Sequence, residues 1–295
     1  MGLGNLVLVM QSGLNKILFK KYRKFRMTFI NKEQNNQAQE KSFQLESTSD
    51  ETQLIYRDKL HDAFLNTPLP AEDQMFNLGL YTRSSLLVKF LVMNQLYERV
   101  KHIPGHIIEL GVWWGQNMVL LENLRAIHEP FNKQRKIIGF DTFSGYPPAN
   151  NTQPSNKDKL SEVWNEGSYS TSSNYKDYLD NLLKIHESNN VLGHQNGCHE
   201  LVEGDVSITV PEYFEKQPHT MVALAYFDIG IYEPTVKALA AIKPHLMPGS
   251  VILLDELTWA ESPGEAIAFK EVFSRNEYKI EKCEHYPSKS IVTIK

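Results

Sequence analysis

Residues 106–147 constrain the fold of this chain more than any other segment. An apolar run at 107–110 leads to Gly111 and Gly115, a stretch of helical periodicity follows, and a second apolar run at 137–140 ends at Asp141. Short apolar runs on either side of a helix are typical of parallel strands that are buried on both faces. The segment therefore predicts a βαβ unit, and with it an α/β fold built on a parallel sheet.

The same segment carries features of a nucleotide site. Ligands of parallel sheets bind beyond the carboxyl ends of the strands, where glycines let the backbone approach closely and a helix N-terminus presents N–H groups. Asp141 stands where a carboxylate could accept both hydroxyls of a ribose. A glycine pair also serves simply to turn the chain, and an acid at a strand end is often only a cap. The local pattern leaves both interpretations open.

Composition narrows the class of protein. A chain of 295 residues can bury one large core, so we expect a single main domain at residues 54–295. The net charge of −4 gives no reason to expect a nucleic-acid partner. Cys198 and Cys283 each stand far from any second cysteine. This usage indicates reduced thiols and a cytoplasmic protein.

The N-terminal part differs from the rest. Residues 1–30 hold an apolar run at 3–10, followed by lysines and arginines between positions 16 and 26. The charge follows the apolar run, which is also too short to span a bilayer, so we expect neither a secretory signal nor a membrane span. We favour a basic helix that packs on its own domain or a second subunit over one that contacts anionic lipid. Residues 31–53 are polar and typical of a linker.

Acidic residues follow two further apolar runs. The run at 222–227 ends in Asp228, and the run at 250–254 ends in Asp255 and Glu256. As parallel strands they would bring these acids to the same sheet edge as Asp141. Three carboxylates at one place repel one another unless a cation compensates them. Mg²⁺ suits such a set better than Zn²⁺, because no His or Cys accompanies the acids. The alternative is that each acid caps a turn or faces solvent.

Four segments together resemble a known family. They are IELGVWWGQ at 108–116, GFDTFSGYP at 139–147, FDIGIYEPT at 227–235 and LLDE at 253–256. In this order and spacing they are similar to the class I S-adenosylmethionine-dependent O-methyltransferases of the macrocin O-methyltransferase type, metal-dependent enzymes that modify sugar hydroxyls in antibiotic biosynthesis. The resemblance covers residues 75–280. It implies a three-layer, Rossmann-like α/β fold with seven strands, the last antiparallel, and added N-terminal helices.

The resemblance also implies a reaction and its residues. The expected activity is methyl transfer from S-adenosylmethionine, with Mg²⁺, to a hydroxyl of a sugar or natural-product intermediate, by a homo-oligomer. Cofactor contacts are expected from Glu109, Gly111, Trp113, Asp141, Phe143, Gly204 and Asp205. Metal contacts are expected from Asp228, Asp255 and Glu256, with Asp228 also accepting the proton. Substrate contacts are expected from Tyr81, Trp164, Tyr169 and Tyr232.

One long insertion is a candidate lid. Residues 149–173 are polar but include Trp164 and Tyr169, aromatic side chains that need something to cover. Insertions of this size often close over active sites, the alternative being a plain surface loop.

Departures from the family pattern keep two other functions open. The family usually has Arg-Gly-Gly where this chain has Trp114, Gly115 and Gln116, and a second Asp where Gly230 stands. A non-catalytic relative that binds the cofactor is one alternative. An NAD-dependent oxidoreductase is the other, although the third glycine of its motif is missing and the second acidic cluster speaks against it.

Overall fold

The computed structural model describes residues 50–147, 166–190, 197–260 and 263–295. These residues belong to one compact unit, Ser42–Lys295. The predicted basic segment at 1–30, most of the linker at 31–53, Trp164 and residues 149–165 of the candidate lid lie outside the described residues. What the sequence predicts for them stays a prediction.

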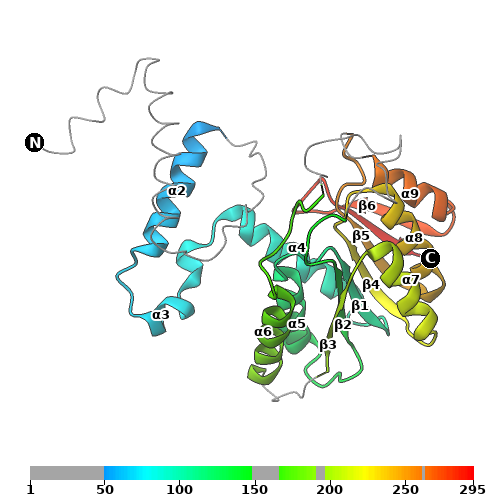
Figure 1. Ribbon diagram of the computed structural model, residues 1–295, viewed down its shortest axis with the longest axis horizontal. Coiled ribbons are helices and arrows are strands. Elements are labelled where there is room, and N and C mark those ends of the chain that lie inside the picture. The colour runs from blue at the N-terminus through cyan, green and yellow to red at the C-terminus, as the bar shows by residue number, and fades with distance from the viewer. Residues whose placement is uncertain (1–49, 148–165, 191–196, 261–262) are drawn as a thin grey trace, which may run out of the picture. The chain divides into compact units, whose positions relative to one another are not determined.

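A seven-stranded sheet forms the centre of the unit (Figure 1). The strands are β1 (His106–Leu110), β2 (Ile137–Asp141), β3 (His199–Glu203), β4 (Val222–Phe227), β5 (Leu246–Leu254), β6 (Tyr278–Lys282) and β7 (Ser290–Ile294). Their order is β3-β2-β1-β4-β5-β7-β6, with the first five parallel and β7 antiparallel to both β5 and β6. The predicted α/β sheet of seven strands with an antiparallel last strand is confirmed.

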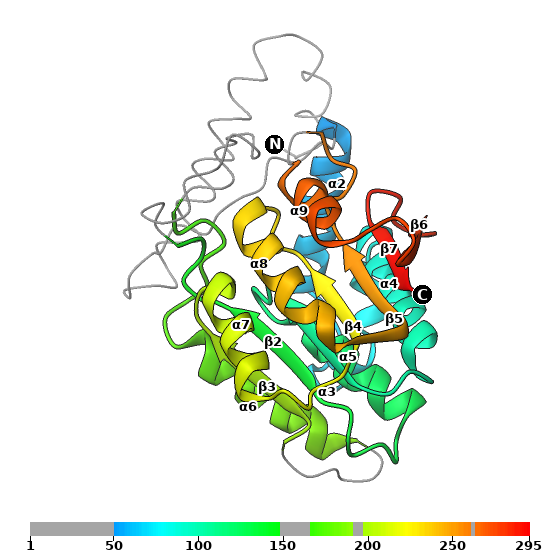
Figure 2. The same cartoon turned by 90° about the vertical axis from the view of Figure 1, so that its right-hand side faces the viewer.

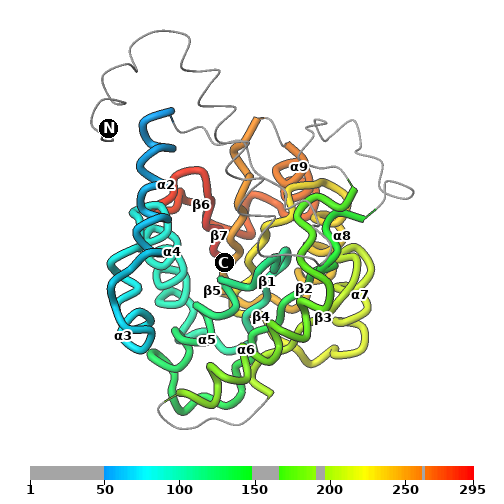
Figure 3. Tube along the Cα trace, turned by 60° about the vertical axis from the view of Figure 1, so that its left-hand side comes forward, coloured from blue at the N-terminus to red at the C-terminus, as the bar shows by residue number. Residues whose placement is uncertain are grey.

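Helices cover both faces of this sheet (Figures 1 and 2). One face carries α4 (Ser84–Val100), α5 (Gln116–His128) and α6 (Tyr175–Asn189), which lie side by side in Figure 3. The other carries α7 (Val206–Lys216), α8 (Tyr232–Ile242) and α9 (Gly264–Val272). Consecutive strand residues point to opposite faces, so Ile107 packs in the first core and Ile108 in the second. This double burial explains why the strands are continuous apolar runs.

Short helices precede α4, as predicted. They are α2 (Glu51–Leu65), α3 (Ala71–Phe76) and the 3₁₀ turn η2 (Leu78–Tyr81); a second 3₁₀ turn, η4 (Lys243–His245), leads into β5. α2 begins within the predicted linker, because Asp50 and Gln53 form a reciprocal capping box at its first turn. Among the described helices, none combines the length and apolarity needed to cross a membrane.

Candidate active site

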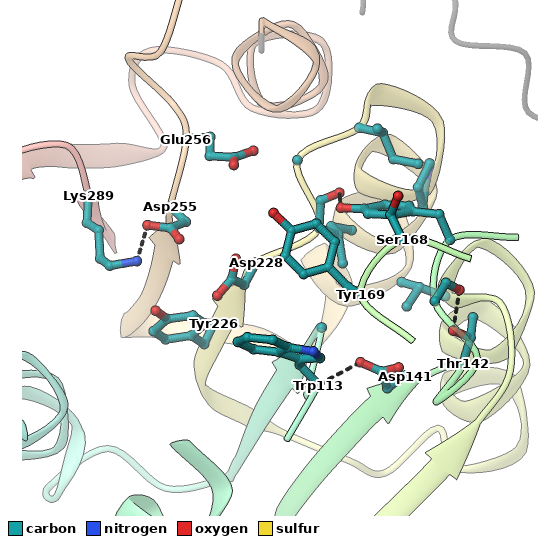
Figure 4. A pocket seen from close by; sticks show the side chains of 18 of the residues that line it. Trp113, Asp141, Thr142, Ser168, Tyr169, Tyr226, Asp228, Asp255, Glu256 and Lys289 are labelled. Atoms are coloured by element: carbon teal, nitrogen blue, oxygen red, sulfur yellow. Dashed lines mark hydrogen bonds and ion pairs between the residues drawn. The ribbon is translucent and has the colours of Figure 1, made fainter. Parts of the chain in front are cut away.

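A cavity of about 610 Å³ opens at the carboxyl ends of the parallel strands (Figure 4). Parallel strands end on the same side of a sheet, so residues that follow β1, β2, β4 and β5 meet there. Of the residues predicted from the sequence, the cavity is lined by Gly111, Trp113, Asp141, Tyr169, Asp205, Asp228, Asp255 and Glu256. The topology therefore gathers most of the predicted site in one place.

Glycines permit the close approach of two chain segments beneath the cavity. Gly111 follows β1 with a φ of +90°, and a Cβ there would lie 2.1 Å from the backbone oxygen of Asp228. The Asp228 N–H donates to the Leu110 oxygen at 2.9 Å, which holds the ends of β1 and β4 together. Gly115, at φ +73°, is the N-cap residue of α5, and a Cβ there would meet Leu179 at 2.4 Å. Both glycines serve close packing as well as the turn.

Two backbone N–H groups hold the Asp141 carboxylate in place. Its Oδ2 accepts from the Trp113 N–H at 2.8 Å, and its Oδ1 accepts from the Phe143 N–H at 2.6 Å. Trp113 and Phe143 adopt positive φ values of 49° and 54°, which non-glycine residues rarely do. Desolvation of the half-buried carboxylate raises its pKa, and these N–H groups oppose the rise. The strained turns thus fix a carboxylate against the cavity.

Aromatic side chains form one wall. Tyr169 packs edge-on against Trp113 and Tyr146, with ring centroids 5.8 and 5.9 Å apart. Its segment is anchored to the loop after β2, because the Tyr146 N–H donates to Ser168 and the Thr171 hydroxyl donates to the Phe143 oxygen. The end of the candidate lid therefore lies at the cavity. Burial and the nearby acids raise the pKa of Tyr169 to about 12, so the phenol stays protonated.

Asp228 and Asp255 form the acidic part of the site. The Asp228 side chain lines the cavity and is exposed there. Partial desolvation by the surrounding protein atoms and the neighbouring Asp255 carboxylate raise the pKa of Asp228 to about 7. Asp255 forms an ion pair with Lys289, a residue that the sequence analysis did not single out.

Glu256 does not complete a metal ligand set. Its carboxylate lies apart from those of Asp228 and Asp255 in Figure 4, and its N–H donates to Glu265 Oε2 at 2.7 Å. Within the described ranges, no group of three or more His, Cys, Asp or Glu side chains could hold a metal ion. The three predicted ligands therefore do not fit Mg²⁺ in this arrangement.

Other predicted residues take structural places around the cavity. Glu109 is 1% exposed, accepts from Asn117 Nδ2 at 2.7 Å and does not line the cavity. Phe143 packs in the core and reaches the site through its N–H. The Gly204 N–H donates to the Asp141 backbone oxygen at 2.9 Å, and Asp205 caps α7 by accepting from the Ser207 N–H at 2.8 Å.

Two of the predicted substrate residues have partners outside the cavity lining. The Tyr81 hydroxyl donates to Thr67 Oγ1 at 2.6 Å, and the Tyr232 hydroxyl donates to Glu271. Conversely, Lys289, Arg83 and Lys89 line the cavity without having been predicted. For Lys289 a signal existed, since it directly precedes the last apolar run and so lies near the end of the strand that Asp255 follows.

Comparison with known proteins points to one family. The profile of the macrocin-O-methyltransferase (TylF) family matches residues 90–282. The calicheamicin methyltransferase CalS11 shares 33% sequence identity, with 88% of this chain and 99% of that chain covered, at a TM-score of 0.78. Its apo structure, described as a TDP-rhamnose 3'-O-methyltransferase of calicheamicin biosynthesis, covers 84% of this chain and 96% of that chain at 33% identity and a TM-score of 0.70.

A curated relative from Streptomyces olivaceus is more distant. It is the 8-demethyl-8-(2,3-dimethoxy-alpha-L-rhamnosyl)-tetracenomycin-C 4'-O-methyltransferase, 23% identical over 222 residues, which are 70% of this chain and 75% of the relative.

Proposed function

This chain belongs to the macrocin-O-methyltransferase family, and we propose that it transfers the methyl group of S-adenosylmethionine to a hydroxyl of a sugar. The observation that carries the proposal is the placement of Asp141 and Asp228 on one cavity, Asp141 as the last residue of β2 and Asp228 directly after β4. Asp141 is suited to binding a ribose, and Asp228 is suited to accepting a proton.

The cofactor fits the half of the cavity around Asp141. Both oxygens of this carboxylate are oriented by backbone N–H groups, and carboxylate oxygens accept more than one hydrogen bond, so a ribose diol can still bind. We place the adenine near Asp205 and the methionine part near Gly111 and Trp113, which line the same cavity.

Asp228 is the proposed proton acceptor. Bound S-adenosylmethionine supplies a methyl group already activated by its sulfonium, so the protein must orient the attacking oxygen and remove its proton. As the oxygen–carbon bond forms and the sulfur–carbon bond breaks, the hydroxyl proton passes to the Asp228 carboxylate. A pKa of about 7 suits a general base near neutral pH. Magnesium dependence stays a prediction of the family resemblance, and no step is assigned to the metal.

A nucleotide-linked sugar is the acceptor that the cavity favours. CalS11 is described as acting on TDP-rhamnose, whereas the name of the Streptomyces olivaceus relative indicates a rhamnosyl-tetracenomycin. In this chain, Arg83 is the N-cap residue of α4, Lys89 lies in the same helix, and both line the cavity. Cations beside a helix N-terminus suit a diphosphate. An uncharged glycoside would bring no phosphate to these cations.

Calorimetric titration of S-adenosylhomocysteine tests the cofactor half of the proposal. We expect this product to bind, and we expect NADH, the control, not to bind. Tight binding of NADH without binding of S-adenosylhomocysteine would replace the proposal by an oxidoreductase. Binding of S-adenosylhomocysteine without transfer to any sugar hydroxyl would favour a non-catalytic relative.

A further inference from the structure

The residues that line the cavity follow the order of the strands across the sheet. Asp141 ends β2 on one side, and Asp228 follows β4 in the middle. On the other side Asp255 follows β5, and Lys289 directly precedes β7. Figure 4 shows the same succession of side chains. Because the proposed cofactor occupies the Asp141 side, the acceptor is left with the side formed by β5 and β7.

Two exposed aromatic side chains line the cavity on this β5 and β7 side. Trp259 lies in the connection between β5 and α9 and is 49% exposed. Tyr286 lies in the connection between β6 and β7 and is 44% exposed. Aromatic side chains gain free energy when another group covers them. Two of them on one side of a cavity therefore indicate a ligand surface.

Hydrogen bonds join the two connections that carry these aromatic residues. Thr258 directly precedes Trp259, and its hydroxyl donates to the Ser288 backbone oxygen at 3.4 Å. The Lys289 N–H donates to the Tyr286 oxygen at 2.9 Å. Lys289 Nζ also lies 5.0 Å from the centroid of the Tyr286 ring, a distance suited to a cation–π contact. Trp259 and Tyr286 are thus carried by segments that contact each other.

The cations of α4 belong to the same side of the cavity. This helix packs against β4 and β5, and Cys283 Sγ, just after β6, donates to Gln95 Oε1 of the helix at 3.5 Å. Arg83 and Lys89, at the beginning of the helix, line the cavity. One side of the cavity therefore offers two cations and two aromatic faces. These are the groups that recognise the diphosphate and the base of a nucleotide.

We propose that Trp259 and Tyr286 bind the base of a nucleoside diphosphate sugar by stacking on its plane, while Arg83 and Lys89 bind the diphosphate. This inference rests on the proposed function and extends it to the nucleotide part of the acceptor. Every base has a face on which an aromatic ring can stack. The site therefore selects a nucleotide over a bare phosphate, rather than one base over another.

Calorimetric titration of the full-length protein with TDP and with inorganic pyrophosphate tests the base site. We expect TDP to bind at least about tenfold more tightly than pyrophosphate, because only TDP carries a base. Trp259→Ala should lower the affinity for TDP by about tenfold and leave the affinity for pyrophosphate unchanged. Trp259→Phe keeps an aromatic face and should retain most of the affinity for TDP.

Phe76→Ala is the matched control. It removes an aromatic side chain that is 91% exposed and lies outside the cavity lining, so the affinity for TDP should not change. Thermal denaturation shows that each variant is folded. Equal affinity of wild type and Trp259→Ala for TDP would overturn the base site, as would equal affinity of wild type for TDP and pyrophosphate. The titration needs no cofactor, so failure of S-adenosylhomocysteine to bind would count against the proposed function instead.

Discussion

Gly111 lies directly against the backbone of Asp228, so that a Cβ on the glycine would be 2.1 Å from the aspartate oxygen. The contact joins the end of β1, which forms the floor of the proposed cofactor site, to the end of β4, which carries the proposed base. The proposed cofactor site and the proposed base are therefore in direct contact through their backbones.

Gly111→Ala tests this packing. The methyl group meets a backbone atom at an impossible distance, and φ is +90°, so both sterics and strain oppose the change. We expect a loss of roughly 2–4 kcal/mol in the free energy of unfolding, measured by urea denaturation. Gly79→Ala is the matched control, since a Cβ there meets nothing within 4 Å. A loss at Gly111 no larger than at Gly79 would contradict the described contact.

The buried Glu109 carboxyl should make the stability of the fold depend on pH. Burial raises the pKa of Glu109 from 4.5 to about 8, with the Asn117 hydrogen bond opposing the rise. Between these values the folded protein binds a proton that the unfolded chain has released. Stability is therefore lost as pH rises from about 4.5 to about 8.

Glu109→Gln removes this titration while keeping the shape of the side chain. Relative to the variant, wild type should lose about 5 kcal/mol of unfolding free energy between acidic and alkaline pH. Denaturant titrations of both proteins at several pH values measure the difference. Parallel pH profiles would show that Glu109 is ionised in the folded state.

Asp141→Asn tests the ribose contact. The amide has one acceptor oxygen where the carboxylate has two, and its NH₂ group faces a backbone donor, either that of Trp113 or that of Phe143. We expect S-adenosylhomocysteine affinity to fall by about 10–100-fold in calorimetry. Thermal denaturation of the variant without ligand shows how much of the loss is structural. Unchanged affinity would remove Asp141 from the cofactor site.

Arg83→Gln tests the class of acceptor. If Arg83 binds a diphosphate, KM for a TDP-linked deoxysugar should rise about tenfold while kcat changes little, because the contact is made equally in ground state and transition state. An uncharged glycoside of the same sugar is the control. Its KM should be the same for wild type and for the variant. Equal effects on both acceptors would argue against a diphosphate at α4.

Much of the fold could be predicted from local sequence patterns, because parallel strands that are buried on both faces appear in the sequence as apolar runs. The acids that directly follow such runs are then expected at one edge of the sheet. Asp141, Asp228 and Asp255 were placed in this way. The interactions between particular side chains could not be predicted in this way. Lys289 meets Asp255 only through the β5–β7 register, and Glu256 parts from the other acids because Glu265 holds its backbone. The sequence pattern around Tyr81 and Tyr232 does not show whether these side chains line the cavity.

The central claim is that this chain moves a methyl group from sulfur to a sugar oxygen with Asp228 as the base. Transfer of labelled methyl from S-adenosylmethionine to TDP-linked deoxysugars, compared in wild type and Asp228→Asn, tests it most directly. We predict transfer by wild type, and in the variant a loss of about 100-fold or more in kcat with S-adenosylhomocysteine affinity nearly unchanged. Equal rates of transfer by the two proteins would contradict the account.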